Sequence, residues 1–257
     1  MKKFTKVLAV VLAVACAVAV AGCSKKEATD KEYVTEKGTL VVGITNFAPM
    51  DYKDDSGAWI GFDADFANAF AEKLGVKVEF KEIDWDNKFV ELDAKGIDCV
   101  WNGMTITDEV TNSSSCTDAY AINNQILVMK SEEIDKYKDT DSIKDLKFAV
   151  EVGSAGAAYA EDEELKYDEV AAQTDALLEV KSGSADACII DSTMAASMTG
   201  EGTDYSDLKA GLVLTDEEYG VSFRKGSDLT AELNTFIQEN KDGLLKELSD
   251  KYKVSLS

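Results

Sequence analysis

The sequence contains no histidine and only one arginine, Arg224, in 257 residues. Without histidine there can be no Ser-His-Asp or Cys-His catalysis, no HExxH zinc site and no imidazole that titrates near neutral pH. Lysine and arginine together number 27 against 49 acidic residues, which gives a formal net charge of −22. Because phosphate backbones and anionic membrane surfaces attract basic residues, nucleic acid and anionic lipid are not expected partners.

Cysteine is also scarce, with five residues and no CxxC spacing. Cys99 and Cys188 lie in short apolar runs, where a free thiol behaves as a small buried hydrophobe. A disulfide between Cys99 and Cys116 is the alternative. The sequence therefore predicts no metal site and no cofactor.

One long apolar run is present, and it lies at the N-terminus. Lys2, Lys3 and Lys6 precede fifteen apolar residues, 7–21, which is fewer than the roughly 18 to 20 that span a bilayer as a helix. Residues 1–22 are therefore predicted to be a signal peptide. The sequence Val-Ala-Gly-Cys at 20–23 resembles the lipobox of bacterial lipoproteins, in which Cys23 would carry a diacylglycerol. The alternative is an ordinary signal peptide with an incidental cysteine.

After Cys23, residues 24–32 show no apolar period and are predicted to be a flexible tether. The full sequence is 45% apolar, enough for a substantial core, and its length suits one large domain or two of about 100 residues. Short β-branched runs alternate there with segments of helical period. Strands are predicted at 40–44, 76–80, 98–101, 125–129, 147–150, 187–190 and 219–223, and helices at 63–74, 87–95, 171–181 and within about 228–251. This alternation predicts an α/β fold with mostly parallel sheets that helices cover on both faces.

Four stretches, 47–52, 61–65, 101–109 and 185–191, have the order and spacing of the family 3 extracellular solute-binding proteins, and the chain resembles that family from about residue 38 to 254. These proteins are the receptors of polar amino-acid ABC importers. The resemblance implies a two-lobed type II periplasmic-binding-protein-like fold, in which each lobe is a mostly parallel sheet flanked by helices and two crossover strands join the lobes. Lobe 1 would comprise residues 33–126 and 219–257, and lobe 2 residues 127–218.

The same resemblance implies a ligand site in the cleft between the lobes. It assigns aromatic walls, polar groups for the backbone of an amino acid, a residue facing the ligand side chain, helix N-terminal amides for a carboxylate, and a partner for an α-ammonium. Phe47 and Trp85 would be the aromatic walls, and Asn102, Gly103, Met104 and Thr105 would bind the backbone of the amino acid. Glu151 would face the ligand side chain, and the amides at Ser154 and Ala155 would receive a carboxylate. Asp191 would pair with the α-ammonium. The two aromatic rings could instead belong to the core, and Asp191 suits a helix N-cap equally well.

One departure from the family leaves the ligand open. Relatives usually carry an arginine that grips the α-carboxylate, and Val110 stands at that position here. Arg224 is predicted far away, on a strand at the hinge side. A carboxylate would therefore depend on the amides at 154–156, on Thr105 and on Asn102, or the ligand has none. Glu151 would favour a cationic or amide-bearing ligand group.

The sequence thus predicts a monomeric, lipid-anchored receptor on the outer face of the cytoplasmic membrane. It would bind a small polar amine, an amino acid in the first place, and deliver it to an ABC permease. Two alternatives remain on the same fold. One is an enzyme similar to cyclohexadienyl dehydratase, with Glu151 as a general acid, and the other is the ligand-sensing lobe of a signalling receptor.

Overall fold

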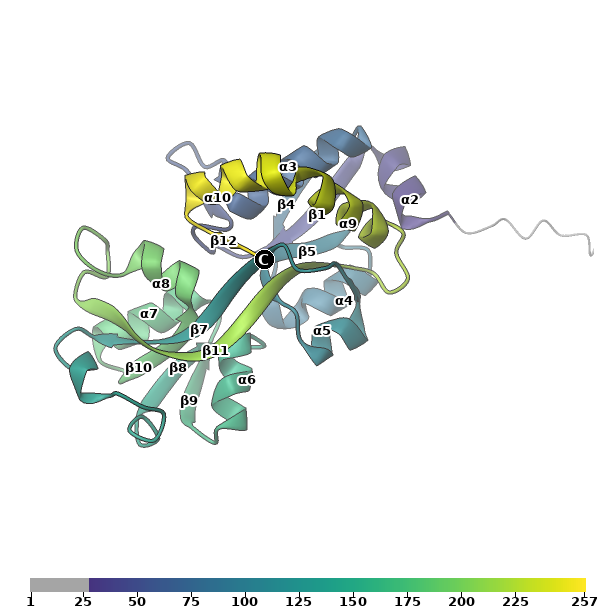
Figure 1. Ribbon diagram of the computed structural model, residues 1–257. Helices are drawn as coiled ribbons and strands as arrows, with labels where there is room; N and C mark the ends of the chain where they lie inside the picture. The colour runs from purple at the N-terminus through teal and green to yellow at the C-terminus, as the bar shows by residue number, and fades with distance from the viewer. Residues whose placement is uncertain (1–27) are drawn as a thin grey trace, which may run out of the picture.

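The computed structural model describes residues 28–257, so the predicted signal peptide at 1–22 and the predicted lipidation site Cys23 lie outside the described residues. Two groups of strands and helices are joined by a pair of long strands, as Figure 1 shows. We call the group around β4, β1 and β5 the first lobe and the group around β10, β8 and β9 the second lobe. The predicted fold class, a two-lobed α/β fold, is confirmed.

The strands form a sheet in the order β4-β1-β5-β11-β7-β10-β8-β9. Within each lobe the outer strands are parallel, whereas the central strands β7 and β11 pair antiparallel with each other and carry the chain between the lobes. The strands are β1 (Thr39–Ile44), β4 (Lys77–Glu82), β5 (Cys99–Thr105), β7 (Ala121–Lys130), β8 (Lys147–Glu151), β9 (Lys166–Val170), β10 (Ala187–Asp191) and β11 (Leu208–Phe223), with short strands β6 (Ser115–Cys116) and β12 (Ser255–Leu256) at the side and a separate hairpin of β2 (Tyr52–Lys53) and β3 (Trp59–Ile60).

Helices cover the strands of both lobes (Figure 1). The first lobe carries α2 (Asp30–Lys37), α3 (Phe62–Leu74), α4 (Lys88–Asp93), α5 (Asp108–Ser113), α9 (Leu229–Asn240) and α10 (Lys246–Tyr252). The second lobe carries α6 (Ala155–Asp162), α7 (Gln173–Ser182) and α8 (Ser192–Met198). Three further turns of helix are η1 (Trp85–Asn87), η2 (Ile134–Lys136) and η3 (Lys241–Leu245). The C-terminal α9 and α10 pack on the first lobe, so that lobe is built from both ends of the chain.

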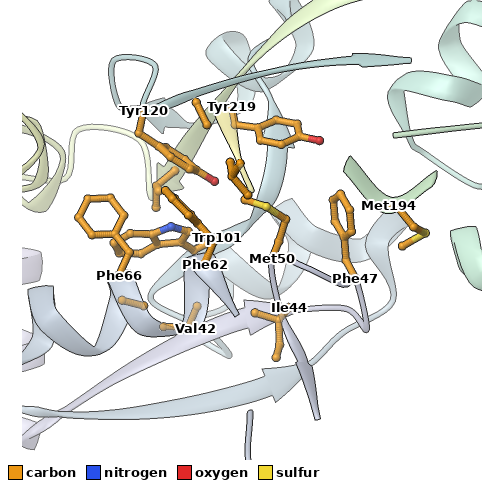
Figure 2. Close-up of a cluster of buried hydrophobic side chains, with 14 of the residues drawn as sticks. Val42, Ile44, Phe47, Met50, Phe62, Phe66, Trp101, Tyr120, Met194 and Tyr219 are labelled. Carbon is orange, nitrogen blue, oxygen red and sulfur yellow. The ribbon is translucent and has the colours of Figure 1, made fainter. Parts of the chain in front are cut away.

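Helix α3 illustrates how local sequence sets the core of the first lobe. Its apolar stripe buries Phe62, Phe66 and Phe70 completely, and the helix ends where Gly75 adopts a left-handed φ of 75°. This agrees with the predicted helix at 63–74 and its glycine stop. The Phe66 ring meets Trp101 edge-on with centroids 5.0 Å apart, in the aromatic cluster of Figure 2. Because Trp101 lies in β5, this packing fixes the strand whose end forms part of the site described below.

The seven predicted strands all have counterparts, but the structure adds to them. Strand β9 was not predicted, and β11 begins at Leu208 instead of near residue 219. Both additions have alternating or largely exposed side chains, so they lack the continuous apolar runs that identify buried strands. The predicted lobe boundaries at 126/127 and 218/219 fall inside the crossover strands β7 and β11.

The predicted tether is wrong in its last residues, because α2 already begins at Asp30. Thr29 caps this helix in a capping box with Glu32, a Thr-x-x-Glu signature that the sequence carries. Asp30 also forms an ion pair with Arg224, with oxygen and nitrogen 3.0 Å apart, and Arg224 donates to the Ile97 carbonyl oxygen at 2.8 Å. The single arginine therefore docks α2 on the first lobe.

The three cysteines of the described residues are free thiols. Cys99 and Cys188 are buried, as predicted, and Cys116 is partly exposed. The alternative disulfide between Cys99 and Cys116 is not formed in this structure.

Candidate functional site

A cavity of about 210 Å³ lies between the two lobes. Since a water molecule occupies about 30 Å³ in the liquid, the cavity has room for one small solute. Its walls come from the segment that follows β1, the C-terminal ends of β5, β8 and β10, η1, a residue of β7, and the starts of α4, α5, α6 and α7. All ten residues predicted from the sequence line it: Phe47, Trp85, Asn102, Gly103, Met104, Thr105, Glu151, Ser154, Ala155 and Asp191.

The aromatic walls are also part of the core. Phe47 and Trp85 are only 3% and 8% exposed. Figure 2 shows the Phe47 ring between Met50 of the first lobe and Met194 of the second. The rings therefore serve both as walls of the cavity and as members of the core, because each lines the cavity and also packs in a hydrophobic cluster.

The segment at the end of β5 is held by hydrogen bonds to the protein itself. The Gly103 N–H donates to Asp63 Oδ2 at 2.6 Å, and the Thr105 hydroxyl donates to Glu217 Oε2 at 2.7 Å. The Asn102 side-chain amide donates to Asp51 Oδ2 at 2.8 Å. These groups, which the family resemblance assigns to the ligand, therefore already have partners within the chain. They give the segment a fixed geometry rather than a set of free donors.

Gly103 is a position where only glycine fits without strain. Its φ is +54°, and a Cβ there would lie 2.7 Å from Cε1 of Phe47. The residue beneath it, Asp63, is fully buried, and burial raises the pKa of its carboxyl to about 7. A buried polar layer thus supports the floor of the cavity on the first lobe.

Asp191 ends β10 and stands at the cap position of α8, but its side chain makes no capping hydrogen bond. Its Oδ1 accepts from Asn123 Nδ2 at 2.7 Å and from the Tyr219 hydroxyl, and its Oδ2 accepts from Gln173 Nε2. Burial has the largest effect on the pKa of Asp191 and repulsion from Glu217 the next largest, and both raise this pKa well above its usual range. Asp191 therefore joins the second lobe to both crossover strands.

Glu151 presents a different carboxyl group to the cavity. The side chain is 3% exposed, and its buried Oε1 has no hydrogen-bond partner. Burial raises the pKa of Glu151 to about 8, although the nearby ammonium of Lys88 acts in the opposite direction. An unpartnered buried carboxyl oxygen is costly, so a donor from a bound solute would stabilise it.

Ser154 and Ala155 mark the start of α6 at the same wall. The Ser154 hydroxyl accepts from the Ala157 N–H at 3.1 Å and so caps the helix. The first N–H groups of a helix attract negative charge because no intrahelical carbonyl satisfies them. This end of α6 is thus the electropositive part of the second lobe's wall.

Lys88 was missed by sequence reasoning, which treated it as one residue of an amphipathic helix. It is 4% exposed, lines the cavity and donates from Nζ to the carbonyl oxygens of Trp85 at 3.3 Å and Gly153 at 3.0 Å. Gly153 belongs to the second lobe, so this lysine bridges the lobes. A second bridge runs from the Ser197 hydroxyl to the Ala48 carbonyl oxygen at 3.0 Å. Nothing in the local sequence distinguishes Lys88 from a solvent-exposed lysine.

Val110 also lines the cavity, where it packs with Trp85 and Met104. Arg224 does not line it.

Within residues 28–257, no group of three or more acidic or cysteine side chains is arranged to hold a metal ion. In the same part of the chain, no helix has the length and apolarity needed to cross a membrane.

Comparison with known proteins agrees with this architecture. The profile of the bacterial extracellular solute-binding proteins, family 3, matches residues 40–255. The chain belongs to this family. It is 32% identical over 252 residues to the L-cystine-binding protein TcyJ of Escherichia coli K12, covering 91% of this chain and 90% of TcyJ, and 31% identical over 230 residues to the arginine-binding extracellular protein ArtP of Bacillus subtilis, covering 84% and 86%.

Solved structures of the family superpose over most of the chain. A mutant of the arginine-binding protein of T. maritima matches with a TM-score of 0.81 and 30% identity, over 87% of this chain and 98% of that one. The ancestral amino acid-binding protein AncCDT-1, a precursor of cyclohexadienyl dehydratase, matches with a TM-score of 0.79 and 32% identity, over 86% and 98%. The resemblance inferred from four sequence stretches is therefore confirmed.

Proposed function

We propose that this family 3 protein is the receptor of an ABC importer and binds an amino acid in the cavity between its lobes. The observation that carries the proposal is the convergence of the ten predicted residues, drawn from both lobes, on one cavity of solute size. Relatives named for binding cystine and arginine, and a structure with bound histidine, support an amino acid as the ligand.

The acidic side chains around the cavity favour a ligand with a cationic or amide-bearing side group. Asp108, Glu109, Glu151 and Asp191 line it, against one cation, Lys88. Asp191 is fully engaged with the protein, whereas Glu151 retains an unpartnered oxygen. A positively charged group placed at Glu151 would favour the ionised form of its carboxyl group and form a charge-assisted hydrogen bond with it.

Binding would proceed by closure of lobe 1 (33–126 and 219–257) on lobe 2 (127–218). The hinge would lie at residues 125–129 and 218–222, in the two crossover strands. The bridges from Lys88 to Gly153 and from Ser197 to Ala48 support this, since they join the lobes directly and must break when the cleft opens. Contacts made only in the closed form would then couple closure to ligand binding.

Outside the described residues, we propose that a signal peptide at 1–22 is removed and that Cys23 carries a diacylglycerol. The protein would be a monomer held at the outer face of the cytoplasmic membrane, where it delivers its ligand to the permease. Two acyl chains give stable anchoring where one gives only marginal binding.

The test is a thermal-shift screen of the purified mature chain against L-arginine, L-histidine, L-cystine and L-glutamine. A ligand present at 100 times its Kd should stabilise the folded protein by about 2.7 kcal/mol. The proposal predicts such a shift for at least one of them, with 1:1 stoichiometry by isothermal titration calorimetry. An unchanged melting temperature with every amino acid would refute it.

We further propose that the site binds without catalysing a reaction. Glu151, which is protonated near neutral pH by virtue of its raised pKa, is the residue that would serve as the general acid of a dehydratase. The relatives reported above are named for binding amino acids and not for converting them. Incubation with prephenate or arogenate is therefore expected to leave both unconverted. Formation of a decarboxylated product would overturn this part of the proposal.

A further inference from the structure

Lys88 is a buried ammonium without a carboxylate partner. It starts α4, and in the described part of the chain its Nζ forms no ion pair within 4.0 Å. An ammonium has three N–H donors, and two are used on the carbonyl oxygens of Trp85 and Gly153. Burying such a charge is costly unless an anion or further acceptors compensate. The environment of Lys88 is therefore incomplete without an acceptor in the cavity.

The surroundings of Lys88 partly compensate for its burial. Burial lowers the pKa of its ammonium, while Glu109, Asp86 and Glu151, in order of decreasing effect, raise it from longer range. The ammonium also lies over the Trp85 ring, 5.0 Å from its centroid. These interactions favour the charged form of Lys88 but leave its third N–H without a hydrogen-bond acceptor.

The position of Lys88 coincides with the electropositive end of α6. The Gly153 carbonyl that it contacts immediately precedes Ser154 and Ala155, whose helix begins at the cavity wall. Lys88 is also the single lysine or arginine among the described residues that line the cavity. Val110, where relatives usually carry an arginine, is apolar and packs in the same cluster as Trp85. Positive charge in this cavity is thus supplied from position 88 and not from position 110.

We propose that Lys88 binds the carboxylate of the solute and, through the Gly153 carbonyl, links that solute to the second lobe. This deepens the proposed function and rests on it. The carboxylate would accept from the third N–H of Lys88 and from amides at the start of α6, while Glu151, which lines the same cavity, takes a cationic group. A lysine acts as a point charge and lacks the planar bidentate fork of arginine. The site would therefore require a carboxylate but hold it in a less restricted orientation.

The experiment compares amino acids with amines that lack only the carboxylate: L-arginine with agmatine, L-histidine with histamine, and L-cystine with cystamine. Affinities are measured by isothermal titration calorimetry on the mature chain and on Lys88→Met. Lys81→Met is the matched control, because Lys81 lies in the same lobe, pairs with Glu91 at 2.8 Å and does not line the cavity.

For the pair that binds, the wild type and Lys81→Met should prefer the amino acid by roughly 10- to 100-fold, the range expected for a charge-assisted hydrogen bond. Lys88→Met should bind the amino acid more weakly by that factor and the amine with nearly unchanged affinity, so that the preference disappears. Lys88→Arg should retain it. Should Lys88→Met fail to fold, Lys88→Gln, which keeps a donor for the Gly153 carbonyl, provides the same comparison.

The outcomes separate this inference from the proposed function. If a wild-type preference persists unchanged in Lys88→Met, or if the wild type binds amine and amino acid equally, Lys88 is not the carboxylate partner, although the protein still binds a solute. If the wild type binds neither member of any pair and no amino acid in the thermal-shift screen, the proposed function itself fails, and this inference fails with it.

Discussion

The substitution Glu151→Gln probes the charge of the cavity most directly. It replaces the carboxyl by an amide of nearly the same shape, at the end of β8, where the side chain is 3% exposed and Oε1 has no partner. Burial raises the pKa of Glu151 from 4.5 to about 8 in the folded protein. In the absence of ligand, the ionised form is therefore disfavoured by folding.

The sign of the effect follows from proton linkage. Between pH 4.5 and about 8 the folded state keeps a proton that the unfolded state releases, so Glu151 lowers the stability progressively as the pH rises through this range. Each pH unit corresponds to about 1.4 kcal/mol, which over the 2.5 units from pH 4.5 to pH 7 gives an upper bound of roughly 3.5 kcal/mol. Glutamine has no such proton, so Glu151→Gln should be more stable than the wild type by up to that amount at pH 7. The two should be equally stable near pH 4.

The assay is urea unfolding of ligand-free protein at intervals from pH 4 to pH 9. Glu169→Gln is the control, because Glu169 is exposed on the neighbouring strand β9 and opposes Val150 in the sheet. Its substitution should leave the pH dependence of the wild type unchanged. A stability difference between Glu151→Gln and the wild type that is the same at pH 5 and pH 8 would refute the reasoning.

Three other substitutions test separate features. Gly103→Ala places a Cβ 2.7 Å from the Phe47 ring at a φ of +54°, and should cost about 1–3 kcal/mol in urea unfolding and weaken binding by calorimetry; unchanged affinity would show that this floor does not shape the site. Arg224→Met removes the ion pair with Asp30 and the hydrogen bond to the Ile97 carbonyl oxygen, while Asp98 keeps its ion pair with Lys37 at 2.6 Å, so unfolding should show a loss of about 1–3 kcal/mol with ligand affinity retained in the folded fraction; unchanged stability would contradict this. Cys23→Ser should move the protein from the membrane fraction to the culture supernatant or periplasm, and continued membrane association would argue against the lipid anchor.

Much of the fold was predictable because its signals are local. Helix α3 follows from a phenylalanine stripe that ends at Gly75, and the buried parallel strands follow from continuous β-branched runs. The Thr-x-x-Glu box that begins α2 was present in the sequence too, but the predicted tether passed over it. Strand β9 carried no comparable signal, since its pairing with β8 and not its own composition defines it.

The candidate site likewise has features that the sequence predicts and features that depend on tertiary contacts. The sequence by itself determined the family, through four spaced motifs, and ten of the residues that line the cavity. Only the tertiary structure decided which of their polar groups are already engaged, as Asp191 is with Asn123 and Tyr219, and which retain an open oxygen, as Glu151 does. It also decided that Lys88 is buried, because the carbonyl of Gly153 that helps to cover it comes from the other lobe, 65 residues away in the chain. Periodicity and propensity describe neighbours in sequence, whereas burial, pKa and hydrogen-bond partners depend on segments that meet only when both lobes are in place.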